Sequence, residues 1–133
     1  MSDSDGKKPR VPVPAINEET RPFWDATAEG KLLLKRCDDC GEVHYYPRTI
    51  CPFCMSDNTQ WVESSGRGSV YSYSVFRRAP VPYCLAYVTL DEGVTMMTNI
   101  IGADLDAIAI GMPVKVRFVD TGEGCALPYF TPA

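Results

Sequence analysis

The sequence lacks long apolar runs and any excess of positive charge. A transmembrane helix needs about 20 consecutive apolar residues, and no segment approaches that length. Thirteen Lys and Arg residues stand against 17 Asp and Glu residues, which gives a formal net charge of −4. A protein that binds phosphate backbones in general is expected to be basic instead. The polar first residues also lack the apolar region of a secretory signal. We therefore expect a cytoplasmic protein that neither spans a membrane nor binds nucleic acid in general.

Signatures of catalysis are also scarce. The chain has a single histidine, His44, and neither a G-x-S-x-G nucleophile motif nor a G-x-x-x-x-G-K-[ST] phosphate loop. The segment Gly66-Arg67-Gly68 is too short for a dinucleotide-binding fingerprint and indicates a flexible entry to a strand. A Cys-His-acid triad would have to combine His44 with a cysteine from a distant part of the chain. We expect no enzyme activity from this chain on its own.

The composition is that of a globular protein. Of 133 residues, 45% are hydrophobic and 11% are aromatic, which is enough to bury the core of one domain or of two very small units. Six cysteines are present. In a reducing compartment we expect cysteines to be metal ligands or free thiols rather than disulfides.

Four of the cysteines have metal-site spacing. Cys37 and Cys40 form one C-x-x-C pair, and Cys51 and Cys54 form a second pair ten residues later. Each pair can form a knuckle around one ion, with four thiolates at about 2.3 Å from Zn²⁺. A closed four-thiolate site leaves no position open for substrate, so we expect one structural zinc per chain. Iron in a rubredoxin-like centre is the alternative, because four thiolates alone do not distinguish the two metals.

The remaining thiols and the imidazole lie outside this motif. Cys84 and Cys125 fall in strand-like or loop segments, where we expect small buried side chains rather than nucleophiles. His44 is next to Tyr45 and Tyr46, and it suits a stacking or surface role at least as well as a ligand role.

The chain divides into four expected segments. Residues 1–16 contain three prolines and predict an extended tail. Residues 17–30 predict a short helix that is capped by Thr20 and ended by Gly30. Residues 31–62 form the cysteine-rich ribbon, and residues 63–133 form a β domain.

Alternating apolar residues and one hairpin signal, Asp91-Glu92-Gly93, define the β domain. We expect strands at 70–76, 85–90, 94–101, 114–118 and 126–130, with a helical turn at 104–110 before the fourth strand. This order and size predict a five-stranded OB-fold barrel. The expected fold is mainly β, with a short N-terminal helix, a rubredoxin-like zinc ribbon and a C-terminal OB-fold barrel.

The order of short motifs is similar to that of a known family. The motifs are a Phe-Trp helix ending in Glu29-Gly30-Lys31-Leu32, Cys37-x-x-Cys40-Gly41, Pro47-Arg48, Cys51-Pro-x-Cys54, Gly66-x-Gly68-x-Val70-Tyr71-Ser72-Tyr73-Ser74-Val75, Leu90-Asp91-Glu92-Gly93 and Ile110-Gly111-Met112-Pro113-Val114. From about residue 18 to residue 130, the chain resembles the zinc-ribbon plus OB-fold acyl-CoA-associated family, once catalogued as domain of unknown function 35.

This resemblance implies a function. Members of the family are small companions of thiolase-fold enzymes, with which they form hetero-oligomers that make or cleave carbon-carbon bonds beside a CoA thioester. The catalytic Cys and His residues belong to the partner. By resemblance, this chain is an essential accessory subunit that docks on a thiolase-fold subunit and completes or gates its CoA and substrate channel.

A loop between the first two expected barrel strands offers contacts for CoA. Arg77 and Arg78 open this loop and Tyr83 closes it, next to the usual ligand face of an OB-fold. Two guanidinium groups and an aromatic ring suit the phosphates and the adenine of CoA, as a ligand shared with the partner. The alternative is a solvated loop whose charges only maintain solubility.

Binding of single-stranded nucleic acid is the alternative function, because zinc ribbons and OB-folds both serve it. Tyr71, Tyr73 and Phe76 lie on the first expected strand, and base stacking needs exposed aromatic rings beside a basic groove. However, residues 63–133 hold five basic and seven acidic side chains. Tyr71 and Tyr73 are also expected to share one face with Val75, as in a core.

Overall fold

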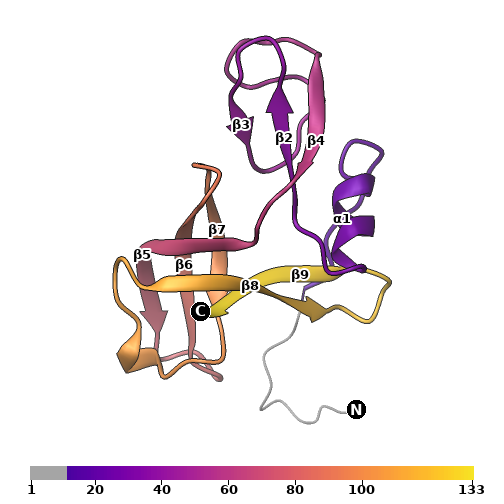
Figure 1. Ribbon diagram of the computed structural model, residues 1–133. Coiled ribbons are helices and arrows are strands. Elements are labelled where there is room, and N and C mark those ends of the chain that lie inside the picture. The colour runs from indigo at the N-terminus through magenta and orange to yellow at the C-terminus, as the bar shows by residue number, and fades with distance from the viewer. Residues whose placement is uncertain (1–11) are drawn as a thin grey trace.

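The computed structural model describes residues 12–133, so most of the expected extended tail lies outside the described residues. In Figure 1 a small three-stranded sheet stands above a five-stranded barrel, and the helix α1 lies beside both. The expected fold, mainly β with a short helix, a ribbon and a closed barrel, is confirmed. Within residues 12–133, no helix has the length and apolar character needed to cross a bilayer.

The helix α1 (Arg21–Thr27) ends as predicted but begins differently. Gly30 has a φ of +77°, and the N–H groups of Gly30 and Lys31 donate to the carbonyls of Thr27 and Ala26 at 3.1 and 3.0 Å. This is a Schellman ending, which favours glycine at the left-handed position.

The side chain of Thr20 does not cap the helix, so that expectation is wrong. Thr20 itself has αR backbone angles (φ −104°, ψ −6°), whereas a capping side chain usually requires an extended residue. Its hydroxyl is hydrogen-bonded to Asn17 instead, in a turn that precedes the helix.

The ribbon is an antiparallel sheet in the order β3-β2-β4. Its strands are β2 (Leu33–Cys37), β3 (Val43–His44) and β4 (Thr59–Glu63). Lys35 on β2 is opposite Trp61 on β4, and its ammonium group lies 4.3 Å from the centroid of the indole ring. This contact lets a mostly buried lysine remain inside a small sheet.

The barrel closes in the order β5-β6-β7-β9-β8. Its elements are β5 (Arg67–Phe76), β6 (Tyr83–Leu90), β7 (Thr95–Ile100), the 3-10 turn η1 (Leu105–Ala107), β8 (Pro113–Asp120) and β9 (Ala126–Pro132). The three strands, helical turn and two strands expected from the sequence are thus confirmed, although the turn is shorter than 104–110. The strands β7 and β9 run parallel and share the single register pair Ile100 and Phe130.

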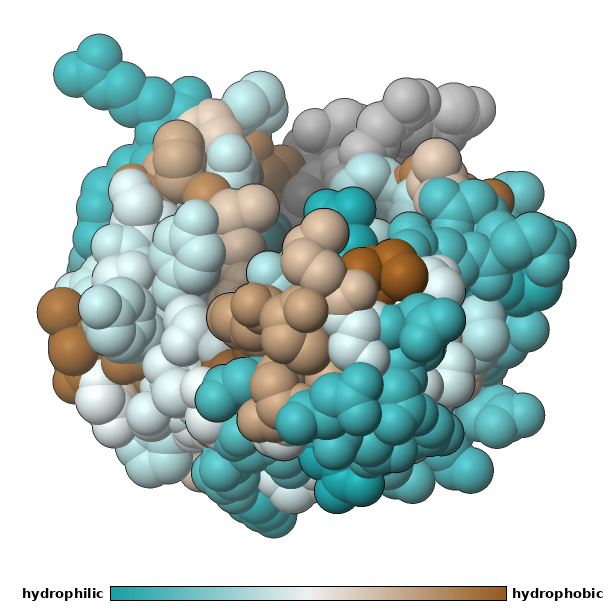
Figure 2. Space-filling view, turned by 90° about the horizontal axis from the view of Figure 1, so that it is seen from above, coloured by the Kyte–Doolittle hydropathy of each residue, from teal (hydrophilic) through white to brown (hydrophobic). Residues whose placement is uncertain are grey.

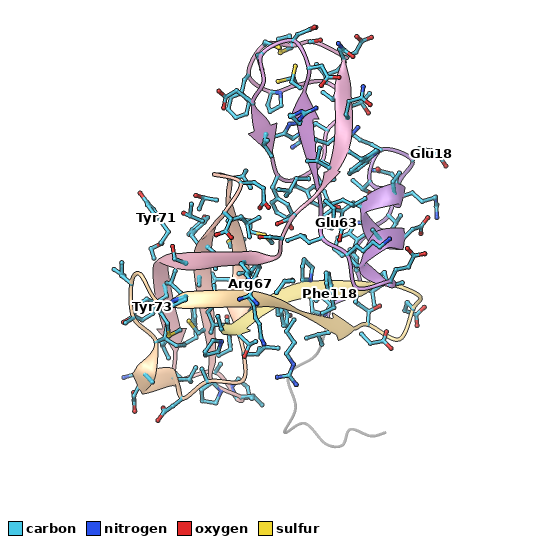
Figure 3. All side chains as sticks on the ribbon, viewed as in Figure 1. Glu18, Glu63, Arg67, Tyr71, Tyr73 and Phe118 are labelled. Carbon is cyan, nitrogen blue, oxygen red and sulfur yellow. The ribbon has the colours of Figure 1, made fainter. Side chains whose placement is uncertain are left out.

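A β-bulge at Tyr71 changes which residues of β5 face the core. The register of β5 on β6 shifts between Val70 and Ser72. Val70 is buried, whereas Tyr71 and Tyr73 are 66% and 39% exposed, and Figure 3 shows both tyrosines projecting from the edge of the barrel. The expectation that both tyrosines lie in the core with Val75 is therefore wrong for Tyr71, which is the extra residue of the bulge. Beyond the bulge, Tyr73 and Val75 pair with the buried Ala86 and Cys84, so these two do share the inner face, although Tyr73 stays partly exposed.

One continuous core joins helix, ribbon and barrel. Phe23 of α1 is fully buried and contacts the rings of Trp24, Tyr45 and Tyr46 at centroid distances of 4.9 to 5.7 Å. The indole N–H of Trp24 donates to the hydroxyl of Tyr46 at 2.7 Å. The buried hydroxyl of Thr27 accepts the backbone N–H of Ala126 on β9 at 3.0 Å.

Candidate metal centre and ligand surfaces

The four cysteines of the two C-x-x-C pairs lie together at one end of the ribbon. Their Sγ atoms all lie within 4.8 Å of one another, at 3.5 Å for Cys37 and Cys54 and 3.7 Å for Cys40 and Cys51. Zinc-sulfur bonds of about 2.3 Å in a tetrahedron require sulfur-sulfur separations of about 3.8 Å. The donor set therefore fits one tetrahedral ion, and none of the four is in a disulfide.

The two knuckles have the same backbone hydrogen bonds. The N–H groups of Gly41 and Met55 donate to the carbonyls of Cys37 and Cys51, at 2.8 and 2.9 Å. The N–H groups of these two cysteines in turn donate to the residues five positions later, at 2.9 and 2.8 Å. Both knuckles therefore present their thiols from the same local structure.

Backbone N–H groups donate to the sulfurs of Cys37 and Cys51, the buried cysteine of each pair. Hydrogen bonds from the backbone, of which that of Cys40 is the strongest, lower the pKa of Cys37 to about 7. The N–H of Phe53 donates to Sγ of Cys51 at 3.4 Å. Because a metal ligand must be a thiolate, donors that stabilise negative sulfur favour metal binding.

His44 is buried, so the surface role that was expected as one alternative for it is wrong. Only 4% of its surface is exposed, and its Nε2 accepts the N–H of Arg48 at 3.1 Å. Burial lowers the pKa of His44 and favours the neutral ring. Its buried Nδ1 has no hydrogen-bond partner among residues 12–133, and the metal-ligand cluster found in this range contains cysteines alone.

Cys84 and Cys125 are buried side chains of the barrel core, as expected. Burial raises the pKa of Cys84, so that its thiol stays protonated. Neither residue has the exposed, electropositive surroundings of a reactive cysteine.

The three candidate CoA residues lie where β5 leads into β6. Arg77 forms an exposed ion pair with Asp106, the middle residue of η1. The ring of Tyr83 stacks flat on that of Phe76, with centroids 4.8 Å apart and planes 5° apart. Arg78 has no ion-pair partner within residues 12–133 and is exposed.

Beside Tyr83 lies a groove of about 610 Å³ that the sequence did not predict. Its lining is Pro12, Pro82, Tyr83, Asn99, Ile100, Ile101, Gly102, Ala103, Leu105, Val119 and Tyr129. The groove follows the side of the barrel where β7 and β9 share one register pair. Nothing in strand alternation marks this position, because it depends on how the barrel closes.

Apart from Arg67 at the start of β5, the outer face of β5, β6 and β7 carries no charged side chain. The positions that alternate with the buried ones are Ser69, Ser72, Ser74 and Phe76 on β5, Tyr83, Leu85, Tyr87 and Thr89 on β6, and Thr95, Met97 and Asn99 on β7. Tyr87 and Met97 are opposite each other and about half exposed. One arginine at its edge does not make the basic groove that nucleic acid needs, although this face does expose aromatic rings.

Two family models match adjacent parts of the chain. The ChsH2 rubredoxin-like zinc ribbon domain matches residues 24–60, and the ChsH2 C-terminal OB-fold domain matches residues 61–119. A solved structure titled "Ltp2-ChsH2(DUF35) aldolase" is 35% identical to the chain, with a TM-score of 0.78, and the match covers 90% of this chain and 98% of that one. The chain belongs to the DUF35 family. The family resemblance is thus confirmed, and the matched ribbon model is a zinc ribbon, which favours zinc over iron.

Curated relatives of this DUF35 chain carry names of acyl-CoA enzymes. A probable enoyl-CoA hydratase alpha subunit of Thermomonospora curvata is 37% identical over 96% of this chain and 42% of the relative. The benzoylsuccinyl-CoA thiolase subunit BbsA of Thauera aromatica is 29% identical over 77% of this chain and 76% of the relative. The DUF35 chain spans less than half of the length of the hydratase subunits that it matches.

Proposed function

We propose that this chain is the non-catalytic, zinc-stabilised small subunit of a cytoplasmic thiolase-like acyl-CoA enzyme, docked on a thiolase-fold subunit whose CoA and substrate channel it completes or gates. The observation that carries the proposal is the match to the Ltp2-ChsH2 aldolase, which covers 98% of the matched chain. The name of that aldolase combines two proteins, Ltp2 and ChsH2. The name of BbsA, a subunit of a thiolase, supports the same type of partner.

The chemistry of the described side chains supports a non-catalytic role. Cys37, Cys40, Cys51 and Cys54 are the proposed ligands of one zinc ion, and four thiolates leave no open coordination position. The ion would supply folding free energy to the ribbon. Cys84 and Cys125 are buried in the barrel, where a substrate cannot reach their thiols.

Arg77, Arg78 and Tyr83 are the proposed contacts for the CoA part of the shared substrate. Arg78 has a guanidinium group that is free to bind phosphate, and Arg77 is held nearby by Asp106. The groove beside Tyr83 is lined mainly by apolar side chains. It can accept the uncharged arm of a CoA thioester while the arginines hold the phosphates.

The outer face of β5, β6 and β7, which is uncharged beyond Arg67, supports docking of a protein. Interface cores are depleted in charged residues and enriched in Tyr and Met, and Tyr87 and Met97 lie at the middle of this face. In a protein with 23% charged residues, a face that only contacts solvent is expected to carry charged side chains.

The test is reconstitution with a defined partner. The tagged chain and the thiolase-fold subunit encoded with it are purified separately and together, and cleavage or condensation of CoA thioesters is assayed in each preparation. We expect a stable complex and activity only when both chains are present. Full activity of the partner alone, or a salt-sensitive shift of single-stranded DNA or RNA by this chain at micromolar concentration, would contradict the proposal.

A further inference from the structure

The zinc ribbon ends in an exposed apolar surface, which we call the ribbon tip and define as the side chains of Ile50, Phe53 and Met55. They are 41%, 62% and 74% exposed. Figure 2 looks down on this end of the molecule, where a brown, hydrophobic patch lies among teal, hydrophilic residues. Apolar side chains that are gathered at one point of the surface indicate contact with another molecule.

The first knuckle has no apolar side chain at the positions equivalent to Phe53 and Met55. The two knuckles share their backbone hydrogen bonds, so Asp39 corresponds to Phe53 and Gly41 corresponds to Met55. The first knuckle has a carboxylate facing solvent and a glycine at a φ of +78°. The second has an exposed phenylalanine and an exposed methionine at a φ of +67°. Neither Phe53 nor Met55 assists metal binding. In the free chain the exposed ring and the left-handed methionine are both unfavourable.

The loop that carries the ribbon tip is joined to the first knuckle by hydrogen bonds. The carboxylate of Asp39 accepts hydrogen bonds from the side chains of Ser56 and Asn58, and these bonds lower the pKa of Asp39. They connect the first knuckle to the loop that follows the second. A preorganised backbone reduces the conformational entropy that is lost when the tip is buried, which favours binding. Methionine is also a residue that adapts well to irregular binding surfaces.

The charge around the ribbon tip restricts the kind of partner. From residue 36 to residue 58 four exposed acidic residues, Asp38, Asp39, Glu42 and Asp57, stand against two basic residues, Arg36 and Arg48, and Arg36 is paired with Asp38. Four thiolates with one divalent zinc ion add about two further negative charges. A second copy of this tip, a nucleic acid or an anionic membrane would be repelled. A protein surface with an apolar pocket and a basic rim is the complementary partner.

We propose that the ribbon tip inserts Phe53 and Met55 into an apolar pocket, bordered by Lys or Arg residues, on the thiolase-fold subunit. This inference rests on the proposed function and assigns the ribbon a docking role in addition to the barrel face. Zinc then acts on assembly indirectly, because it fixes the two knuckles that present the tip.

The experiment measures binding of the zinc-loaded full chain to the purified thiolase-fold subunit by calorimetry, together with Tm and zinc content of each variant. The variants are Phe53→Ser, Met55→Gly and Asp57→Lys, with Ile110→Ser as the matched control. Ile110 is another exposed apolar side chain, 71% exposed, but it lies in the barrel domain. No described hydrogen bond or ion pair involves the side chain of Asp57, so its replacement tests charge alone.

We expect Phe53→Ser to weaken binding by about tenfold or more with Tm and zinc unchanged. Met55→Gly should raise Tm by about 3 °C, because it relieves the left-handed residue, and yet weaken binding. Asp57→Lys should slow association, most strongly at low salt. Ile110→Ser should bind like the wild type.

The outcomes separate the two proposals. If the wild type binds and activates the subunit while Phe53→Ser and Met55→Gly bind equally well, the ribbon tip is only exposed surface and the inference is wrong. Equal weakening by Ile110→Ser would also overturn it. If the wild type itself does not bind the thiolase-fold subunit, the proposed function fails, and the inference fails with it.

Discussion

Gly41 and Met55 occupy the same place in the two cysteine knuckles, and both have left-handed backbone angles, with φ of +78° and +67°. A side chain at Gly41 would meet no other atom within 4 Å, so its effect is purely conformational. We expect Gly41→Ala to lower the free energy of unfolding by about 1 kcal/mol. Urea denaturation of the zinc-loaded chain measures this change.

The control for this prediction is Met55→Ala. It exchanges one L residue for another at the equivalent position, and it removes a side chain that is mostly exposed. We expect a change within about 0.5 kcal/mol. If Gly41→Ala were as stable as the wild type, the equivalence of the two knuckles in solution would be wrong.

Loss of one cysteine should remove the metal and the ribbon structure together. Cys40→Ser leaves three thiolates, and the binding free energy of the metal is part of the folding free energy of the ribbon. We expect zinc content to fall from about one ion per chain to well below it, and amide resonances of the ribbon to lose dispersion. Cys84→Ala, in the barrel, should keep its zinc. A Cys40→Ser chain that stays folded without metal would show that zinc is dispensable.

The fold was largely predictable because its signals are local. The spacing of Cys37, Cys40, Cys51 and Cys54 defines the knuckles whatever surrounds them, and glycine at position 93 (φ +93°) marks the hairpin between β6 and β7. Strand alternation and these turn residues were enough to give the order of the barrel elements.

The features that were not predictable depend on the closed barrel. The strand β5 pairs with β6 on both sides of the bulge at Tyr71, whereas its pairing with β8 ends at Ser69, just before the bulge. The position of the bulge follows from closure, which alternation does not encode. The groove beside Tyr83 and the burial of His44 are also consequences of tertiary packing. The ribbon tip did have a sequence signal, since Met55 stands where the first knuckle has glycine.

The hydrogen bond between Thr27 and Ala126 joins residues that are 99 positions apart in the sequence, and it fixes the helix on the barrel. Thr27→Val removes the acceptor and leaves the N–H of Ala126 buried without a partner. We expect a loss of about 1 to 3 kcal/mol in the free energy of unfolding, together with faster hydrogen exchange of the Ala126 amide. Thr27→Ser keeps the hydroxyl and should retain the protection of this amide. Unchanged exchange in Thr27→Val would show that the bond does not form in solution.

Glu92 should make the stability of the junction between ribbon and barrel depend on pH. Burial alone would raise the pKa of Glu92, but hydrogen bonds from the N–H of Ser65 and the hydroxyl of Ser64 outweigh it and hold the pKa below its usual value of 4.5. A carboxyl group whose pKa is lowered by folding stabilises the native state above its unfolded pKa. This contribution is lost as the pH falls through the folded pKa.

The measurement compares the wild type with Glu92→Gln in urea at pH 7 and at pH 3. We expect the wild type to be more stable at pH 7 and the difference to shrink at pH 3, which is below the usual pKa of 4.5 at which the unfolded carboxyl group is protonated. The comparison with Glu92→Gln is needed for two reasons. Protonation of the four thiolates at pH 3 releases zinc from both proteins, and the pKa values of Glu19 and Asp39 are lowered as well. A difference that is the same at both pH values would mean that the carboxylate is not linked to folding.

Arg77 and Arg78 should affect the affinity of the complex for CoA substrates and not its assembly. In the assembled enzyme, replacement of both by Ala should raise KM for the CoA thioester by about tenfold, because two charge-assisted contacts to phosphate are lost. The kcat and the amount of complex should not change. Asp106→Asn is the control, since it breaks the ion pair with Arg77 but leaves both guanidinium groups in place. An unaltered KM in the double variant would mean that these arginines belong to a solvated loop, and that CoA is bound by the partner alone.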